Sequence, residues 1–158
     1  MTAALSGPFL LDVMCGKLAT YLRFCGYDAA YALDREVEAD DALAALAREE
    51  ERTLLTRDVA LAERAGDRGF LLHDRDVEDQ LRELAAVGLD LTLDERPARC
   101  GVCNGPVKRV PADASVPEYA RDPDETPVWR CLDCGQHFWK GSHWRRVEET
   151  LAELYSRN

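Results

Sequence analysis

Short apolar runs alternate with amphipathic segments over residues 9–87 of this chain. The apolar runs predict strands at residues 9–11, 29–33, 53–56 and 69–72. After each strand, apolar side chains recur at helical spacing, over residues 15–25, 40–51, 59–65 and 77–87. Strands and helices that alternate with short links predict a parallel sheet covered on both faces by right-handed crossovers. We therefore expect an α/β fold for this part of the chain.

The later part of the chain carries two cysteine pairs, Cys100-Gly-Val-Cys103 and Cys131-Leu-Asp-Cys134. Each pair puts two thiolates on one tight turn, and together they can close a tetrahedral zinc shell. The 27 residues between the pairs exceed the usual spacing, but residues 111–127 have the proline and acid content of a loop. We predict a C-terminal zinc ribbon whose metal is structural, because four thiolates leave no position for an activated water.

Disulfides are the alternative use of these cysteines, and they would require an oxidising compartment and usually a secretory signal. The start of the chain has no basic n-region, and Asp12 interrupts its only apolar run before that run could act as a signal core or reach the ~20 residues of a membrane span. We expect a soluble, cytoplasmic protein with no membrane partner. Cys15 and Cys25 lie on a predicted helix and are expected to be small buried apolar residues.

Length and charge suggest two units. The 158 residues suffice for one core plus a metal-dependent appendage, which we expect at residues 1–96 and 97–158. The first unit holds 11 Lys+Arg against 21 Asp+Glu, whereas the second holds 9 of each. An acidic surface argues against tight, non-specific binding of nucleic acid over the whole molecule. A polyanion must therefore be bound locally, by a basic patch or through bound cations.

Aspartates follow the predicted strands. Asp12 comes directly after the first strand and Asp58 closely follows the third. Because ligands bind at the carboxyl ends of the strands in an open parallel sheet, these two carboxylates should converge. Asp40, or its neighbour Asp41, opens the helix that leads into the third strand, so its side chain can point toward the same edge. Asp74 follows the fourth strand and is a further candidate.

Carboxylates gathered at one edge would repel one another unless a divalent cation neutralised them. Hard oxygen ligands favour magnesium or manganese, and such a site suits hydrolysis of a phosphodiester by a metal-activated water. Lys17 and Arg57 supply cations that could hold the phosphate. The alternative is that each aspartate only caps the following helix, and Asp40 is well placed to be such a cap. Three acids in register at one end of a sheet favour the metal site.

The segment from Gln136 to Arg146 is the most basic and aromatic part of the chain. Aromatic rings stack on unpaired bases while cations hold phosphates, so this segment is a candidate contact for single-stranded RNA. The alternative is that its tryptophans, with Trp129, pack the ribbon against the sheet and the final helix. The candidate RNA contacts are Lys140, His143, Trp144, Arg145 and Arg146.

Several stretches together carry a family resemblance. They are FLLDVMCGKLA at residues 9–19, Leu22-Arg23, Gly26-Tyr27-Asp28, Leu55-Thr56-Arg57-Asp58, Gln80-Leu81-Arg82, Arg99-Cys100 and FWKGSHW at residues 138–144. This combination resembles the Mut-seven C-terminal RNase domain, and the likeness runs from about residue 9 to residue 150. The resemblance implies a PIN-like nuclease fold with an added zinc ribbon.

The resemblance also implies a metal-dependent ribonuclease with Asp12, Asp40 and Asp58 as its acidic residues. Asp40 matches the family's acid better than Asp41, because Leu43 follows at the family's spacing. Nothing in the acid spacing itself distinguishes RNA from DNA, so RNA is favoured by the resemblance alone.

Three functions are consistent with these observations. The first is a ribonuclease that uses magnesium or manganese to cut single-stranded or structured RNA. The second is a non-catalytic RNA-binding or ribosome-associated adaptor that works through its zinc ribbon. The third, weaker one is a phosphatase or a DNA-directed nuclease that uses the same carboxylates.

Overall fold

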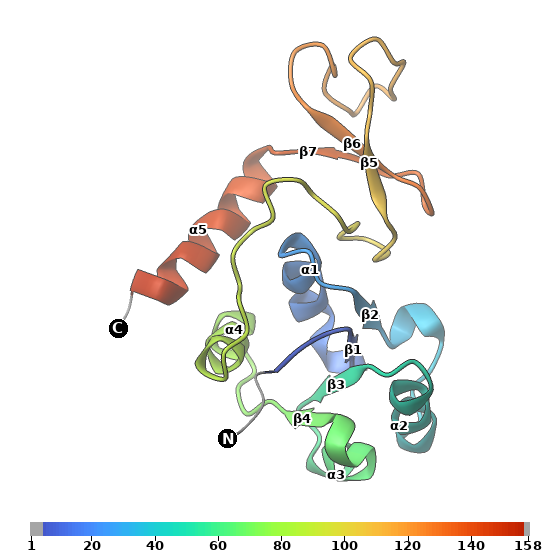
Figure 1. Ribbon diagram of the computed structural model, residues 1–158, viewed down its shortest axis with the longest axis vertical. Helices are drawn as coiled ribbons and strands as arrows, with labels where there is room; N and C mark the ends of the chain where they lie inside the picture. The colour runs from blue at the N-terminus through green and yellow to red at the C-terminus, as the bar shows by residue number, and fades with distance from the viewer. Residues whose placement is uncertain (1–4, 157–158) are drawn as a thin grey trace.

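The computed structural model describes residues 5–156, so the outermost residues of both predicted units lie outside it. Its elements form a parallel sheet with helices, followed by an antiparallel ribbon and a last helix (Figure 1). The α/β part consists of β1 (Phe9–Leu11), α1 (Gly16–Phe24), β2 (Ala29–Tyr31), α2 (Asp40–Glu49), β3 (Thr53–Thr56), α3 (Val59–Ala65), β4 (Gly69–Leu71) and α4 (Val77–Ala86). Three 3-10 turns lie at Val13–Cys15, Leu33–Arg35 and Gly66–Arg68. The predicted α/β fold is confirmed.

The larger sheet has the strand order β2-β1-β3-β4, and every neighbouring pair is parallel. In the central strand β1, Leu10 lies opposite Ala30 of β2 and Leu54 of β3. Since parallel strands need a crossover, each of the first three strands is followed by a helix that returns to the start of the next one. The carboxyl ends of all strands therefore lie at one edge of the sheet.

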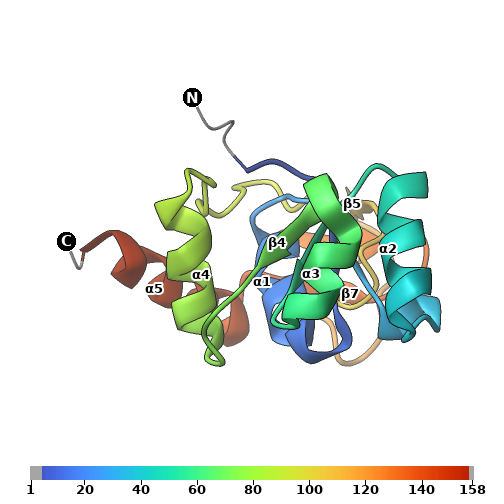
Figure 2. The same cartoon turned by 90° about the horizontal axis from the view of Figure 1, so that it is seen from below.

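Both faces of the sheet are covered, as the near-continuous apolar strands predict. Phe9 and Leu11 of β1 point into the cluster formed with α1, α4 and the last helix. Leu10 points the other way, into the cluster formed with α2 and α3. Figure 2 shows these helices around the sheet when it is viewed from below. Alternation along a single strand thus builds two cores, because successive side chains point to opposite faces.

The second predicted strand is shorter than expected. It ends at Tyr31 rather than continuing to Leu33. The carbonyl groups of Ala32 and Leu33 accept hydrogen bonds from the N–H groups of Arg35 and Glu36, at 3.1 Å each, so the chain turns instead of extending the ladder.

The ribbon is a three-stranded antiparallel sheet in the order β5 (Val107–Arg109), β6 (Val128–Cys131) and β7 (His137–Trp139). It is followed by α5 (Ser142–Ser156). Val147, Leu151 and Leu154 of α5 are buried in the same cluster as the apolar face of α1. The last helix therefore returns from the ribbon to complete the core of the α/β part. None of the described helices is both long enough and apolar enough to span a membrane.

Candidate active site and metal centre

The strand order places a switch point between β1 and β3. From β1 the chain moves to β2 on one side, and then crosses to β3 on the other side. In open α/β sheets the crevice beyond the carboxyl ends of such strands is where ligands bind. Asp12 directly follows β1 and Asp58 lies two residues beyond the end of β3, so the two predicted acids flank this crevice.

Thr56 connects the two acids. Its side chain is fully buried at the end of β3. The hydroxyl group donates a 2.8 Å hydrogen bond to Asp12 Oδ2 and accepts one of 3.0 Å from the backbone N–H of Asp58. Sequence reasoning assigned no role to this threonine, although it belongs to the Leu55-Thr56-Arg57-Asp58 stretch that carries part of the family resemblance. The contact fixes the Asp12 carboxylate relative to the start of α3.

Both acids also bind backbone N–H groups. Asp12 Oδ1 accepts a 2.7 Å hydrogen bond from Val13 N, and only 8% of the Asp12 residue is exposed. Asp58 is the N-cap of α3, because its Oδ1 accepts from Ala60 N at 2.9 Å and from Leu61 N at 3.3 Å. Asp12 is likewise the N-cap of the 3-10 turn Val13–Cys15, so both acids cap the element that follows them, as the alternative interpretation expects. Capping uses only part of the hydrogen-bonding capacity of the Asp58 carboxylate, which has about four lone pairs.

The other predicted acids are placed differently. Asp40 is the first residue of α2, whose N-cap is Ala39, so Asp40 is not the side-chain cap of that helix. α2 begins nine residues after the end of β2, beyond the turn at Leu33–Arg35. Asp41 is exposed and forms an ion pair with Arg64 of α3.

Asp74 is in the loop between β4 and α4, where its N–H donates to Glu83 Oε2 at 3.1 Å and its carbonyl accepts from Gln80 at 2.9 Å. Within residues 5–156, the four cysteines are the one group of three or more side chains whose potential metal-binding atoms lie within 4.8 Å of one another. Asp12, Asp40 and Asp58 do not form such a group.

A cleft of about 680 Å³ lies between the start of α1 and the start of α4, and it is lined by Val13 of the turn after Asp12 but not by Asp12, Asp40 or Asp58. Its lining includes two cations and three acids, Lys17, Arg75, Asp76, Glu78 and Asp79. Lys17 is exposed in the first turn of α1. The predicted phosphate-binding lysine thus lines a cleft at the carboxyl edge of the sheet.

Arg57 carries a buried donor. Its Nε has no hydrogen-bond partner among the described residues. Unsatisfied buried donors are rare in native structures and call for an explanation such as a water or a functional role. The pKa of the Cys15 thiol is raised to about 11, mainly by burial and also by the charge of Asp12, while the charge of Arg57 acts to lower it. Arg57 is therefore close to Cys15, at the Asp12 end of β1.

The four cysteines form a compact cluster at the base of the ribbon. The Sγ atoms of Cys100 and Cys134 are 3.8 Å apart, and those of Cys103 and Cys131 are 3.4 Å apart. Four sulfurs at about 2.3 Å from a tetrahedral zinc would be separated by about 3.8 Å, so the cluster has the size that zinc requires. The cysteines could hold a zinc ion.

The backbone supports these thiols. Cys131 Sγ accepts a hydrogen bond from Cys134 N at 3.4 Å, and Cys103 Sγ accepts one from Gly105 N at the same distance. Burial acts to raise the pKa of Cys131, but hydrogen bonds from the N–H groups of Cys134 and Asp133 outweigh it, and the pKa falls to about 7. A thiolate at this position is available for metal binding near neutral pH.

Gly105 is needed for close packing beside the cluster. A Cβ atom at this position would lie 2.7 Å from Asp133 Oδ2 and 2.9 Å from Cys131 Sγ. Both distances are shorter than van der Waals contact allows, so a side chain here would force Asp133 or the candidate metal ligand Cys131 to shift.

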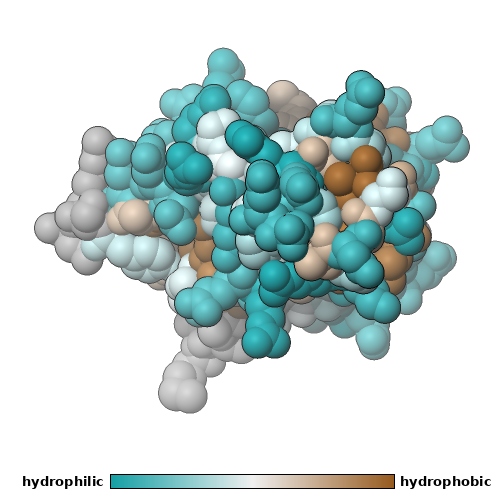
Figure 3. Space-filling model, turned by 90° about the horizontal axis from the view of Figure 1, so that it is seen from above, coloured by the Kyte–Doolittle hydropathy of each residue, from teal (hydrophilic) through white to brown (hydrophobic). Residues whose placement is uncertain are grey.

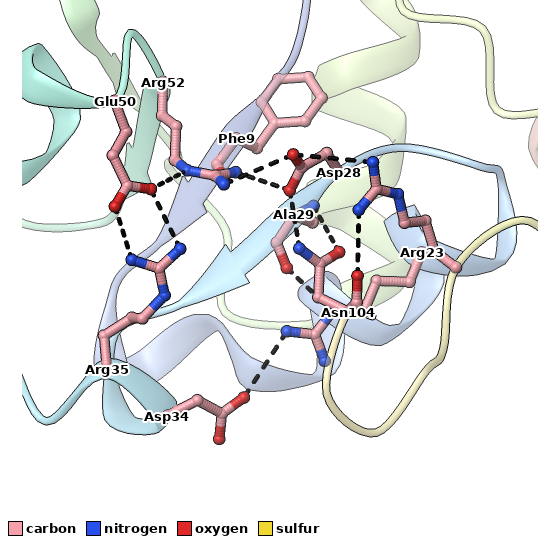
Figure 4. A network of polar contacts seen from close by, with 10 residues as sticks. Phe9, Arg23, Asp28, Ala29, Asp34, Arg35, Glu50, Arg52 and Asn104 are labelled. Carbon is pink, nitrogen blue, oxygen red and sulfur yellow. Dashed lines mark hydrogen bonds and ion pairs between the residues drawn. The ribbon is translucent and has the colours of Figure 1, made fainter. Parts of the chain in front are cut away.

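The first cysteine turn is docked onto the α/β part by polar contacts (Figure 4). Arg23 of α1 is almost fully buried, and its guanidinium donates to Ala29 O and to Gly101 O, at 2.9 Å each. Asn104 follows the turn, and its side-chain amide is both an acceptor and a donor. Its Oδ1 accepts a hydrogen bond from Ala29 N at 2.9 Å, and its Nδ2 donates one to Asp28 Oδ1 at 2.7 Å. The turn that would hold zinc is therefore tied directly to strand β2.

Asp28 is the centre of this network. Its Oδ1 also accepts a 2.7 Å hydrogen bond from Arg52, which in turn donates to the carbonyl of Phe9 at 3.0 Å. Burial acts to raise the pKa of Asp28, but hydrogen bonds from Arg52 and Asn104 outweigh it and lower the pKa below its ordinary value. Sequence reasoning gave neither Asp28 nor Arg23 a role, although both belong to the stretches that resemble the family.

The predicted RNA-binding segment divides into packed and exposed side chains. Trp129 and Trp144 are buried, which agrees with the alternative that tryptophans pack the ribbon. Lys140 Nζ donates to the carbonyl of Glu95 at 2.7 Å and lies 5.2 Å from the centre of the Trp144 ring. His143, Arg145 and Arg146 are exposed. The face at the ribbon end of the molecule is mostly hydrophilic, with hydrophobic side chains gathered in a few places (Figure 3).

Comparison with known proteins decides the family. Residues 8–151 match the model of the Mut7-C RNAse domain, which is nearly the whole chain. The chain belongs to this family. No curated protein and no solved structure gives a significant match. Membership in the Mut7-C RNAse domain family indicates a nuclease-type function and implies RNA as the substrate.

Proposed function

We propose that this Mut7-C RNAse domain is a metal-dependent ribonuclease that hydrolyses RNA phosphodiester bonds at the carboxyl edge of its parallel sheet. The observation that carries the proposal is the position of Asp12 and Asp58 on the two sides of the switch point between β1 and β3, joined through Thr56. Asp40, at the start of α2, is the third proposed acid. Magnesium or manganese suits these oxygen ligands.

A metal ion held there would lower the pKa of an attacking water and neutralise charge on the phosphate. The residues of the chain supply orientation and charge. Thr56 holds the Asp12 carboxylate in one position, and Asp58 remains exposed to solvent while it caps α3. Arg57 and Lys17 supply cations for the phosphate oxygens, and Lys17 lines the cleft beside the turn that follows Asp12.

Asp41 and Asp74 have a smaller part in this proposal. Asp41 is mostly exposed and paired with Arg64, and the backbone of Asp74 is held by contacts with α4. The zinc ribbon is proposed to be structural, and its four free thiols suit the reducing cytoplasm, where we place the protein. Single-stranded or structured RNA is the proposed substrate.

The test is cleavage of labelled RNA by purified, zinc-loaded protein with added manganese or magnesium. Asp58→Asn is a sharp variant, because asparagine is as good an N-cap as aspartate and only the charge is lost. We expect it to lower the cleavage rate by at least about tenfold, as expected for a lost metal ligand. Asp67→Asn is the matched control, because Asp67 is exposed in the turn before β4, at the opposite edge of the sheet. Equal cleavage by wild type and Asp58→Asn would refute the proposal.

One observation favours a second function, a non-catalytic RNA-binding or ribosome-associated adaptor. Among the described residues, the three acids do not bring their carboxylate oxygens within 4.8 Å of one another, as a preformed metal site would. An adaptor should bind RNA without turnover and without dependence on magnesium or manganese. Comparing RNA, DNA and a small phosphate ester as substrates, with and without these ions, separates the adaptor from a ribonuclease and from a phosphatase or DNA nuclease.

A further inference from the structure

A second cleft lies between α1 and the ribbon, with a volume of about 570 Å³. It meets the cleft at the sheet edge, because Gly16 and Tyr31 line both. The two clefts are therefore neighbours, on either side of Gly16 and Tyr31. The second cleft has the size of a small-molecule site, for which about 300–1,000 Å³ is usual.

Tyr31 is held firmly where the two clefts meet. Its hydroxyl donates a 2.6 Å hydrogen bond to the carbonyl of Val13, in the turn that follows Asp12. Its ring lies against Gly16, where an added Cβ would be 3.0 Å from the ring atom Cζ. The junction is therefore a fixed part of the fold, and Gly16 leaves space for the ring.

The second cleft is lined by rings from three separate segments. Phe24 comes from α1, Phe138 from β7 and His143 from the start of α5. Phe24 and His143 meet edge to face, with their ring centres 5.6 Å apart. Phe24 and Phe138 are half-buried and His143 is exposed, so each ring keeps some accessible surface. Thr20 and Gln136 add polar groups to the lining.

We propose that this cleft binds an unpaired nucleobase of the RNA strand whose phosphate lies at the sheet edge. The proposal rests on the ribonuclease function proposed above and gives the ribbon a share in substrate binding. Unpaired bases stack on aromatic rings whatever their identity, while side-chain hydroxyl and amide groups reach the base edges. An RNA strand fits better than a protein partner, because the cleft adjoins one that contains the proposed phosphate-binding Lys17, and because the exposed Arg145 and Arg146 follow His143 in α5.

The test measures RNA binding separately from cleavage. Full-length, zinc-loaded Asp58→Asn protein, with magnesium present, is titrated with fluorescein-labelled oligouridine and with a blunt RNA duplex, and the fluorescence anisotropy gives both affinities. We expect Phe138→Ala to weaken oligouridine binding by about 5- to 150-fold, the range seen when a stacking residue is lost, and to leave duplex binding within about 2-fold. Phe138→Tyr should restore most of the affinity, because it keeps the stacking face.

Two further variants guard against misfolding. His143 is exposed, so His143→Ala should keep the fold and still weaken oligouridine binding. Leu132→Ala is the matched control, because Leu132 is exposed on the ribbon and does not line the cleft. Oligouridine affinity unchanged within about 2-fold in both Phe138→Ala and His143→Ala would overturn the proposal. So would an equal loss for duplex and single strand, or failure of the parent protein to bind oligouridine.

Failure of the two proposals can be distinguished. If wild-type protein does not cut RNA but Phe138→Ala selectively loses oligouridine affinity, the proposed base-binding cleft is supported and the proposed nuclease function is refuted. If wild type cuts RNA and Phe138→Ala binds and cuts oligouridine equally well, the nuclease function stands and the cleft does not bind a base.

Discussion

Thr56 Oγ1 donates a 2.8 Å hydrogen bond to Asp12 Oδ2, and Thr56 is fully buried. The same hydroxyl accepts from Asp58 N at 3.0 Å, so its single proton is committed to Asp12. This arrangement orients a carboxylate at the end of β1 from the neighbouring strand β3. It explains how two acids separated by 46 positions in sequence keep a fixed relation at one edge of the sheet.

Thr56→Val should therefore destabilise the protein and impair the proposed activity. Valine has nearly the same shape but lacks the hydroxyl, which leaves an Asp12 oxygen and the Asp58 N–H without their partner at a cost of about 1–3 kcal/mol. Urea unfolding measures the change in free energy, and RNA cleavage measures the effect on the site. Thr56→Ser keeps the hydroxyl and should restore most of both. A Thr56→Val protein with wild-type stability and cleavage would show that the hydroxyl contributes nothing.

Zinc removal should loosen the α/β part as well as the ribbon. Metal binding contributes about 10–16 kcal/mol in zinc-finger peptides, so the ribbon should unfold when zinc is lost. The turn at Cys100–Cys103 would then no longer hold Asn104, whose Oδ1 accepts from Ala29 N in β2. We expect a zinc-selective chelator to speed amide hydrogen exchange at Ala29 more than at Leu54 in the central strand β3. Equal protection of Ala29 with and without zinc would contradict this coupling.

Asp28→Asn should destabilise the docked ribbon in a pH-dependent way. Arg52 is largely buried and loses its charged acceptor, so we expect a loss of about 1–3 kcal/mol at pH 7. The pKa of Asp28 is lower in the folded protein than in the unfolded chain. Its stabilisation is therefore fully present above the unfolded value of about 3.9 and is lost as the pH falls through the folded value.

The measurement is urea unfolding of both proteins between neutral pH and about pH 3, a window that spans the ordinary aspartate pKa. The gap in stability between wild type and Asp28→Asn should shrink as the pH falls. Asp90→Asn serves as the control, since Asp90 is an exposed loop residue. A gap that stays constant over the whole range would mean that the charge of Asp28 does not stabilise the fold.

Local pattern was enough to predict most of the architecture. Burial of both sheet faces follows from the apolar strands, and β1 shows it directly, with Phe9 and Leu10 in different cores. The cysteine cluster was predictable because each pair sits on one short turn, so that only the approach of the two turns depends on the fold. The end of β2 was not predictable. The carbonyl groups of Ala32 and Leu33 could accept hydrogen bonds either from a neighbouring strand or from N–H groups three residues later, and the sequence does not show which.

Contacts between segments that are distant in the sequence could not be predicted from the sequence. Arg23 meets Gly101 across 78 positions, and nothing in the pattern around either residue identifies the other. Thr56 looks like any strand-forming residue until the strand order sets it beside Asp12. The candidate acids were found because their position after a strand is a local signal, whereas the distance between them depends on the whole sheet.

Lys140 provides a way to separate packing from RNA binding. Its ammonium group donates to the carbonyl of Glu95 and lies 6.0 Å from the Trp129 ring centre and 5.2 Å from that of Trp144. We expect Lys140→Met to cost about 1 kcal/mol of stability, because a cation–π contact and a hydrogen bond at an exposed site are lost, and to change the tryptophan fluorescence.

In contrast, Arg145→Met should lower RNA affinity with little effect on stability, because Arg145 is exposed in the first turn of α5. Lys140→Arg keeps the charge and controls for the loss of the cation. Urea unfolding and RNA anisotropy on all three variants give the two readouts independently. A contrary result would be a Lys140→Met protein with unchanged unfolding free energy and a larger loss of RNA affinity than Arg145→Met. Lys140 would then be an RNA contact, and the contact of its ammonium group with the tryptophans would not stabilise the fold.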